Sequence, residues 1–172
     1  MLPVGDLWFH SQRRAWMQAA NKFGVKTFGY LFTDPGAPPL APPLLDPQRT
    51  MLSVVRILQS YSFKYCESHR VNRPFTVTHT ADLIYVYGLN GRFGRPASAI
   101  ALGTQMIDYW VSFATSLDPN DGRGSARPVW SQYTSSNKTI LELTSANMSM
   151  IPDDYRAQQI DFINYNAAIF AR

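Results

Sequence analysis

The sequence has little of what would mark a membrane protein, a disulfide-rich protein or a protein with a leader. No run in its 172 residues approaches the roughly 18 consecutive apolar residues that a membrane span requires. The single cysteine, Cys66, excludes an internal disulfide. Residues 1–6 show no basic segment followed by an apolar one, so no signal peptide is predicted. Hydrophobic residues make up 45% and charged residues 16%, which is typical of one globular domain.

The net charge of +4 comes from one short stretch. Between Gln48 and Phe75 lie five basic residues and one acidic residue, and the eleven basic and eleven acidic residues elsewhere cancel. No glycine-aromatic or Cys/His recognition module accompanies this charge, so nucleic acid is not an expected partner. Just before it, six prolines in the thirteen residues 35–47 favour an extended linker over helix or central strand.

Hydrophobic periodicity and turn residues predict three helices and two strands. The helices are expected at Phe9–Lys22, at Ala97–Leu117 and from Pro152 to about Ala171, and the strands at Lys26–Phe32 and Thr139–Thr144. Gly24 stands where a left-handed helix cap belongs, Asp6 suits a cap or a first-turn acid, and Pro152 is placed as a helix start. Met51–Leu58 fits a helix or a strand equally well. The order of elements indicates part of an α/β layered fold with an incomplete sheet.

The helix expected at Ala97–Leu117 is apolar around most of its circumference. One face carries Val111 and Leu117 among five apolar residues, and Leu102, Met106, Tyr109 and Phe113 lie beside it. Such a helix is expected to be mostly buried. Tyr85, Tyr87 and Trp110 are also expected in the core.

The three histidines differ in their surroundings. His10 falls on the first predicted helix, where a plain surface or half-buried role is expected. His69 lies near Cys66, but no second ligand cluster exists, so a metal site is not predicted. His79 stands on a predicted loop before a short apolar segment, a common place for a general base, although a loop histidine without chemistry is the alternative.

Several sequence blocks carry a family resemblance. The segment from His79 to Gly88 reads His-x-x-Asp-x-x-Tyr-Val-Tyr-Gly, and Met106–Ala114 with the following Asp118-Pro119-Asn120 forms a second distinctive block. Together with residues 5–14, 28–32, 128–133 and 141–143, they resemble the type B carboxylesterase/lipase family, the cholinesterase-like α/β-hydrolases, with a fungal character. The resemblance covers residues 3–35 and 75–165 and identifies the C-terminal part of that domain.

The resemblance implies a serine–acid–histidine triad in which His79 is the histidine. The serine pentapeptide Gly-x-Ser-x-Gly does not occur in these 172 residues, and neither do the oxyanion-hole glycines. The acid precedes the histidine in the family's order and would lie before Met1, so we expect a truncated chain that is inactive alone. Asp82 is expected to brace the turn after His79. The resemblance implies an ester substrate for the intact enzyme and neither a metal nor an organic cofactor.

The gap between Phe32 and His79 is longer than the resemblance implies. The surplus, about 40–74, also holds the excess charge and the only cysteine, which indicates an atypical insert, either a translated intron or a true loop. Asn137-Lys138-Thr139 and Asn147-Met148-Ser149 are possible N-glycosylation sites, which suit a secreted parent enzyme. The location of this chain itself stays open. The alternative function is a non-catalytic, cholinesterase-like interaction module or pseudoenzyme fragment, and the isolated chain is expected to self-associate.

Overall fold

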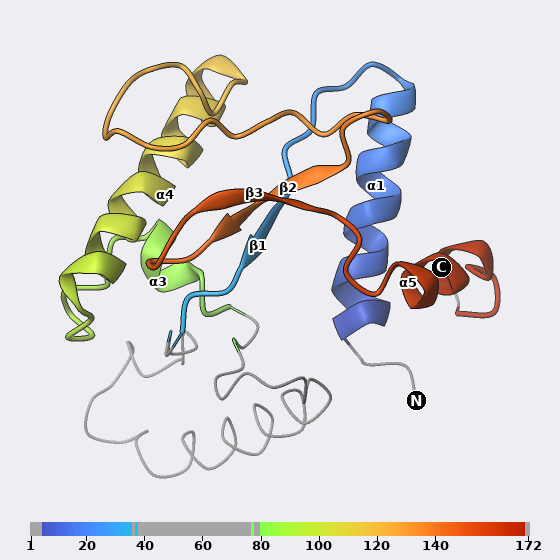
Figure 1. Cartoon of the computed structure of the whole chain (residues 1–172), viewed down its shortest axis with the longest axis horizontal. Coiled ribbons are helices and arrows are strands. Elements are labelled where there is room, and N and C mark those ends of the chain that lie inside the picture. Colours follow the sequence, from blue (N-terminus) through green and yellow to red (C-terminus); the bar gives the residue numbers. More distant parts are fainter. Residues whose placement is uncertain (1–4, 36, 38–76, 78–79, 171–172) are drawn as a thin grey trace, which may run out of the picture. The chain divides into compact units, whose positions relative to one another are not determined.

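The computed structural model describes residues 5–35, 37, 77 and 80–170, and Figure 1 shows its helices and strands. In chain order the elements are η1 (Asp6–His10), α1 (Ser11–Lys22), β1 (Tyr30–Phe32), α3 (Leu83–Val86), α4 (Ala97–Ser116), β2 (Thr139–Leu143), β3 (Ser149–Pro152) and α5 (Ala157–Tyr165). The chain divides into two compact units, and each is described by itself. The first holds residues 1–31, 128–143 and 148–172, and the second holds 32–127 and 144–147.

The first unit begins with the predicted helix, which the structure confirms as η1 followed by α1. Gly24 has φ +72°, the left-handed conformation that glycine adopts without strain, and so ends this helix as expected. Ser11, Arg14 and Met17 form the buried face of α1. The spacing of three residues places these side chains on one side of the helix.

The sheet of the first unit has the strand order β1–β2–β3. β2 and β3 pair antiparallel, with Ile140 opposite Ile151, and the amide of Leu141 donates to the carbonyl of Gly29 over 2.9 Å. The core cluster beside the sheet consists of Met17, Tyr133 and Ile140, with Leu31 and Ile151 packed against it. Ile140 of β2 therefore packs in one core with Met17 of α1.

Two predictions in this unit need correction. The strand expected at Lys26–Phe32 is regular only at Tyr30–Phe32, and Thr27 forms an isolated bridge with Tyr133. Pro152 does not start a helix: it is the last residue of β3, and α5 starts later, at Ala157. Proline lacks an amide hydrogen, and this suits the end of a strand as well as the start of a helix. The sequence around Pro152 therefore does not distinguish the end of a strand from the start of a helix.

Ion pairs with buried carboxylates link η1 and α1 to the residues that follow β3 in the first unit. Asp153 accepts hydrogen bonds from both nitrogens of the Arg13 fork, at 2.6 and 3.1 Å, and from Arg14 at 3.1 and 3.3 Å. The carboxylate of Asp6 is buried and pairs with Arg156. Asp6 does lie in the first turn of η1, as expected, but the helix start has no side-chain cap hydrogen bond.

The second unit is built around α4, against which α3 packs. The prediction of a helix at Ala97–Leu117 is confirmed: α4 spans Ala97–Ser116, and Leu117 closes it with φ +58°. Its buried positions are Ala99, Leu102, Gly103, Met106, Tyr109 and Ser112. The prediction that this helix is mostly buried is wrong for the face that carries Val111 and Leu117, because both of these side chains are exposed.

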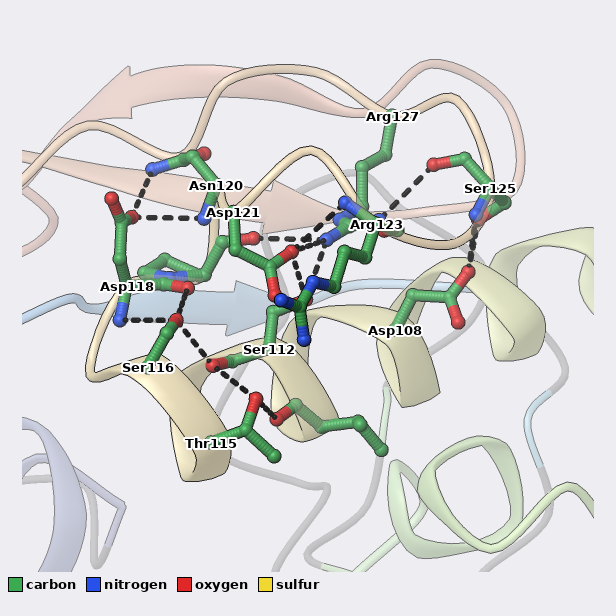
Figure 2. A network of polar contacts seen from close by, with 12 residues as sticks. Asp108, Ser112, Thr115, Ser116, Asp118, Asn120, Asp121, Arg123, Ser125 and Arg127 are labelled. Carbon is green, nitrogen blue, oxygen red and sulfur yellow. Dashed lines mark hydrogen bonds and ion pairs between the residues drawn. The ribbon is translucent and has the colours of Figure 1, made fainter.

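A polar network holds the loop that follows α4 (Figure 2). Arg127 is its centre: Nη2 donates to Ser112 Oγ at 2.8 Å and to the carbonyl of Pro119 at 3.1 Å, and the guanidinium lies 4.9 Å from the centre of the Tyr109 ring. Both the amide and the hydroxyl of Ser125 donate to Asp108, each at 2.6 Å. These contacts bind both ends of the loop to α4.

Candidate functional site

The candidate catalytic residue, His79, lies outside the described residues, as does the proposed insert at 40–74. The description resumes at Thr80, one residue later, in the turn that leads into α3. Thr80 has φ +73°, an uncommon conformation for a β-branched residue. Its carbonyl accepts the amide hydrogen of Leu83 at 3.1 Å, and Ala81 is fully buried. The segment after the histidine is therefore a tight turn that places Ala81 in the core.

A buried polar cluster anchors this segment four residues further on. The Tyr85 hydroxyl donates to the carboxylate of Asp34, which follows β1. Arg95 Nη2 donates to the same carboxylate at 3.2 Å, to the Tyr85 oxygen at 3.1 Å and to the carbonyl of Pro35 at 2.9 Å. The second carboxylate oxygen of Asp34 accepts the amide of Ser145 at 2.7 Å. We call these four residues, Asp34, Tyr85, Arg95 and Ser145, the Asp34 cluster.

The electrostatics of the Asp34 cluster favour a protonated tyrosine. Burial raises the pKa of Tyr85, the hydrogen bond to Asp34 raises it further, and Arg95 lowers it, giving a value of about 12. The phenol thus remains a hydrogen-bond donor at neutral pH. Its edge-to-face contact with Phe32, at 4.9 Å between ring centres, orients the ring that carries it. This arrangement holds a loop in place and does not supply a base.

Sequence reasoning placed Tyr85 in the core but missed Asp34 and Arg95. The structure confirms that Tyr85 is buried, whereas Tyr87 is exposed and the prediction for it is wrong; Trp110 is half-buried. The only sequence signal for Asp34 is a carboxylate shortly after a predicted strand. Nothing in the pattern pairs it with a tyrosine 51 positions along the chain. Asp82 occupies the position before α3 and makes no side-chain cap hydrogen bond there.

The remaining predicted sites are ordinary in geometry. His10 contacts Tyr155 with 5.3 Å between ring centres, as a surface or half-buried residue would. Asn137, before β2, and Asn147, between β2 and β3, are both exposed. Across the described part of the chain, no three His, Cys, Asp or Glu side chains converge so that they could hold a metal ion. None of the described helices is long and apolar enough to cross a bilayer.

Comparison with known proteins decides the family. A model described as "Carboxylesterase family" matches residues 4–163. The chain belongs to the carboxylesterase family. Helices packed with a small three-stranded sheet fit a partial α/β-hydrolase fold of that family, so the predicted family and fold class are confirmed.

Several relatives of this carboxylesterase-family chain are named as lipases. It is 31% identical over 124 residues to Secreted lipase 1 of Botryotinia fuckeliana (strain B05.10), covering 71% of this chain and 20% of that protein. It is 30% identical to Lipase 2 of Geotrichum candidum, covering 67% of this chain and 18% of that protein. Bile salt-activated lipase of Mus musculus is 25% identical and matches 88% of this chain and 20% of its own length. The chain thus spans about a fifth of the length of these relatives.

Proposed function

We propose that this chain is the histidine-bearing part of a carboxylic ester hydrolase and that His79 is the histidine of its triad. The observation that carries the proposal is the carboxylesterase-family match over residues 4–163, which includes the His79 block. The lipase names of the relatives support an ester substrate. The Asp34 cluster supports the assignment, because the segment directly after His79 is anchored through Tyr85 by hydrogen bonds within the second unit.

The proposed role of His79 follows from triad chemistry. Its imidazole would accept the proton of a serine hydroxyl as that oxygen attacks the ester carbonyl, and would pass the proton to the leaving alcohol. It would then take a proton from water as the water attacks the acyl-enzyme, and return it to the serine. No Gly-x-Ser-x-Gly occurs in the 172 residues, so the chain needs a serine and an acid from elsewhere.

The first test is the activity of the chain alone. The purified protein is offered p-nitrophenyl butyrate and a fluorophosphonate probe. We expect neither turnover nor labelling, because loss of the nucleophile in a serine hydrolase costs about 10⁶-fold in rate. A serine that is labelled while the ester turns over would contradict the proposal.

The second test asks whether the missing groups are encoded nearby. The coding sequence upstream of the Met1 codon is read for an in-frame Gly-x-Ser-x-Gly and an acid. If both occur, the longer product is expressed, and His79→Gln should lower its kcat by about 10⁶-fold. His10→Gln is the matched control, since His10 packs on Tyr155, and should retain activity. Full activity of the His79→Gln enzyme would overturn the assignment.

The absence of the serine pentapeptide favours a second candidate function. A non-catalytic, cholinesterase-like interaction module or pseudoenzyme fragment needs no nucleophile. An upstream sequence without the pentapeptide would support this alternative over the hydrolase.

The two sequons are proposed N-glycan acceptors in a secreted form of the protein. Both asparagines are exposed, and the name Secreted lipase 1 of one relative supports secretion. Expression in yeast behind an added leader should give a product whose mass falls on treatment with a glycosidase that cleaves N-glycans. Asn137→Gln and Asn147→Gln should each remove one glycan, and an unmodified product would contradict the proposal.

A further inference from the structure

The turn that follows α1 presents an apolar tip between two lysines. Phe23 and Val25 are 85% and 55% exposed, and Lys22 and Lys26 on either side of them are exposed as well. Gly24 lies between the two apolar residues, and a Cβ added to it would meet nothing within 4 Å, so the turn is open to its surroundings. We call these five residues the Phe23 tip; Figure 1 shows the turn where α1 ends and the chain leads on to β1.

Backbone hydrogen bonds fix the shape of the Phe23 tip. The amide of Val25 donates to the carbonyl of Ala20 at 3.0 Å, and the amide of Gly24 donates to that of Asn21 at 3.0 Å. These two bonds form the Schellman pattern of a helix end. The side chain of Asn21 also accepts the amide hydrogen of Ser135 at 3.1 Å, which joins the turn to a neighbouring loop. The tip is therefore a preformed turn, and a preformed surface loses less entropy when it binds.

The charge of the Phe23 tip has one sign. Residues 7–33 contain no aspartate or glutamate, and neither do residues 122–141, which include the neighbouring loop. That loop leads to Lys138, which is exposed and whose carbonyl accepts the amide hydrogen of Asp153 at 2.9 Å. The carboxylate of Asp153 is buried and paired with two arginines, but Asp154 after it is exposed. We therefore count only the two lysines of the tip itself.

An exposed ring between cations is complementary to an anionic lipid surface. Phe23 can enter the boundary between the headgroups and the acyl chains, which is where aromatic and aliphatic side chains of peripheral proteins are buried. The long apolar stems of Lys22 and Lys26 can follow it while their ammonium groups stay among the lipid phosphates. Each lysine near such a surface adds to the attraction.

A second exposed ring in the first unit lacks this setting. Tyr165, the last residue of α5, is 89% exposed, about as much as Phe23. Residues 157–170 contain no lysine or arginine, and their one acidic residue, Asp161, is exposed. An anionic surface does not attract this segment. Exposure of an aromatic ring thus does not by itself distinguish the Phe23 tip; its charge does.

We propose that the Phe23 tip docks on anionic phospholipid bilayers, with the ring of Phe23 inserted and with Lys22 and Lys26 on the lipid phosphates. The contact is small and peripheral. We expect a partition constant on the order of 10⁴ M⁻¹, comparable to that of a single myristoyl chain. The inference is independent of the proposed hydrolase function.

The test is sedimentation of the full chain with sucrose-loaded vesicles. The protein is made in bacteria, so that no glycan on Asn137 stands near the tip. Vesicles of phosphatidylcholine with about one third phosphatidylserine should bind the wild-type chain, and pure phosphatidylcholine vesicles should bind it roughly tenfold more weakly. Binding to the anionic vesicles should also weaken in about 0.5 M salt, because salt screens the lysines.

Two variants separate the ring from the charges. Phe23→Ser should lower the partition constant at least tenfold, because the inserted ring is lost. The double variant Lys22→Gln and Lys26→Gln should lower it about tenfold on anionic vesicles and leave the weak binding to neutral vesicles unchanged. Tyr165→Ser is the matched control and should stay within about twofold of wild type, because its ring lies away from any lysine. All the substituted side chains are exposed, so the variants should keep the wild-type circular dichroism.

Three results would overturn the proposal. The first is a wild-type chain that stays in solution at millimolar anionic lipid. The second is binding that depends on the lysines but not on Phe23, which would make the tip an ordinary site for polyanions such as an acidic protein. The third is binding that Tyr165→Ser weakens as much as Phe23→Ser, since this would show that any exposed ring of the chain adheres to lipid.

Discussion

At the residue scale, Asp153 is a buried carboxylate that pairs with two arginines. Its side chain is fully buried and takes hydrogen bonds from Arg13 and Arg14, so loss of its charge would leave two guanidinium groups without their carboxylate partner. Asp153→Asn should lower the free energy of unfolding by about 3–5 kcal/mol, the usual cost of breaking a buried ion pair. Urea unfolding measures this loss. Asp154→Asn, at the exposed neighbouring position, is the matched control and should change stability by less than about 0.5 kcal/mol.

Asp153 also predicts how stability depends on pH. Burial by itself would raise the pKa of this carboxyl, but the hydrogen bonds and charges of Arg13 and Arg14 outweigh burial and hold the pKa below its ordinary value. The unfolded chain then binds the proton more readily than the folded chain, so this contribution is present above the ordinary carboxyl pKa of about 3.9 and is lost as the pH falls below it. Urea midpoints measured from pH 7 to pH 2.5 should fall more steeply for wild type than for Asp153→Asn. Parallel curves would contradict the prediction.

Gly29 predicts a steric effect in the core of the first unit. A Cβ added there would lie 2.7 Å from Ile140 Cγ2 and from Met17 Cε, far inside van der Waals contact. Gly29→Ala should therefore destabilise the protein by about 1–3 kcal/mol. Gly91→Ala is the control, because a Cβ at Gly91 meets nothing within 4 Å and the backbone there needs no positive φ. The melting temperature of Gly29→Ala should lie below that of Gly91→Ala, and equal melting temperatures would contradict the prediction.

At the element scale, the loop after α4 depends on one side chain. Arg127 donates hydrogen bonds to Ser112 and to the carbonyl of Pro119, and it forms an ion pair with Asp121 at 3.5 Å (Figure 2). Its guanidinium also lies over the ring of Tyr109. Arg127→Met should increase the local opening of the loop, while the earlier turns of α4 should stay packed on α3. Hydrogen exchange should become faster at residues 118–126 and stay unchanged near Leu102. Arg123→Met removes an exposed arginine from the same loop and should leave both regions protected.

The elements that sequence predicts best are those with local signals. α1 and α4 were predictable because their signals are local: the periodic apolar residues lie within each helix, and Gly24 and Pro119 follow shortly after the helix ends. The start of α5 was not, because Pro152 suits two structures and its strand partner Thr139 comes from elsewhere in the chain. Which side of α4 is buried depends on α3, a neighbour that periodicity cannot identify.

The residues of the candidate site also differ in whether a local sequence signal points to them. His79 is predicted from a short motif through its resemblance to a family, and it stays a prediction. Asp34 and Arg95 were not found, because their roles exist only once the second unit has folded and has brought the carboxylate of Asp34 to Tyr85. Long-range polar pairs of this kind leave no periodic trace in a single sequence.

At the scale of the whole molecule, the Asp34 cluster joins two residues that are 51 positions apart in the sequence. Asp34 and Tyr85 are hydrogen-bonded to one another within the second unit. The segment 40–74 lies between them in the sequence, and its charge and length set it apart from the rest of the chain. Because the cluster already holds Asp34 and Tyr85 together, we expect that this segment is not needed to bring them close.

Deletion of residues 40–74 should therefore leave both units folded. The connection between Asp34 and Tyr85 shortens from 51 to 16 residues, which is still ample for two positions in contact. A shorter loop loses less entropy on closure, by about 1 kcal/mol, so the unfolding midpoint should stay the same or rise. Limited proteolysis and urea unfolding of the deleted and full chains measure this directly. The same deletion in an Asp34→Asn background should be less well tolerated, because the pair that closes the loop is weakened. If the deleted chain lost its cooperative transition while the full chain kept it, residues 40–74 would be part of the folded structure and not an insert.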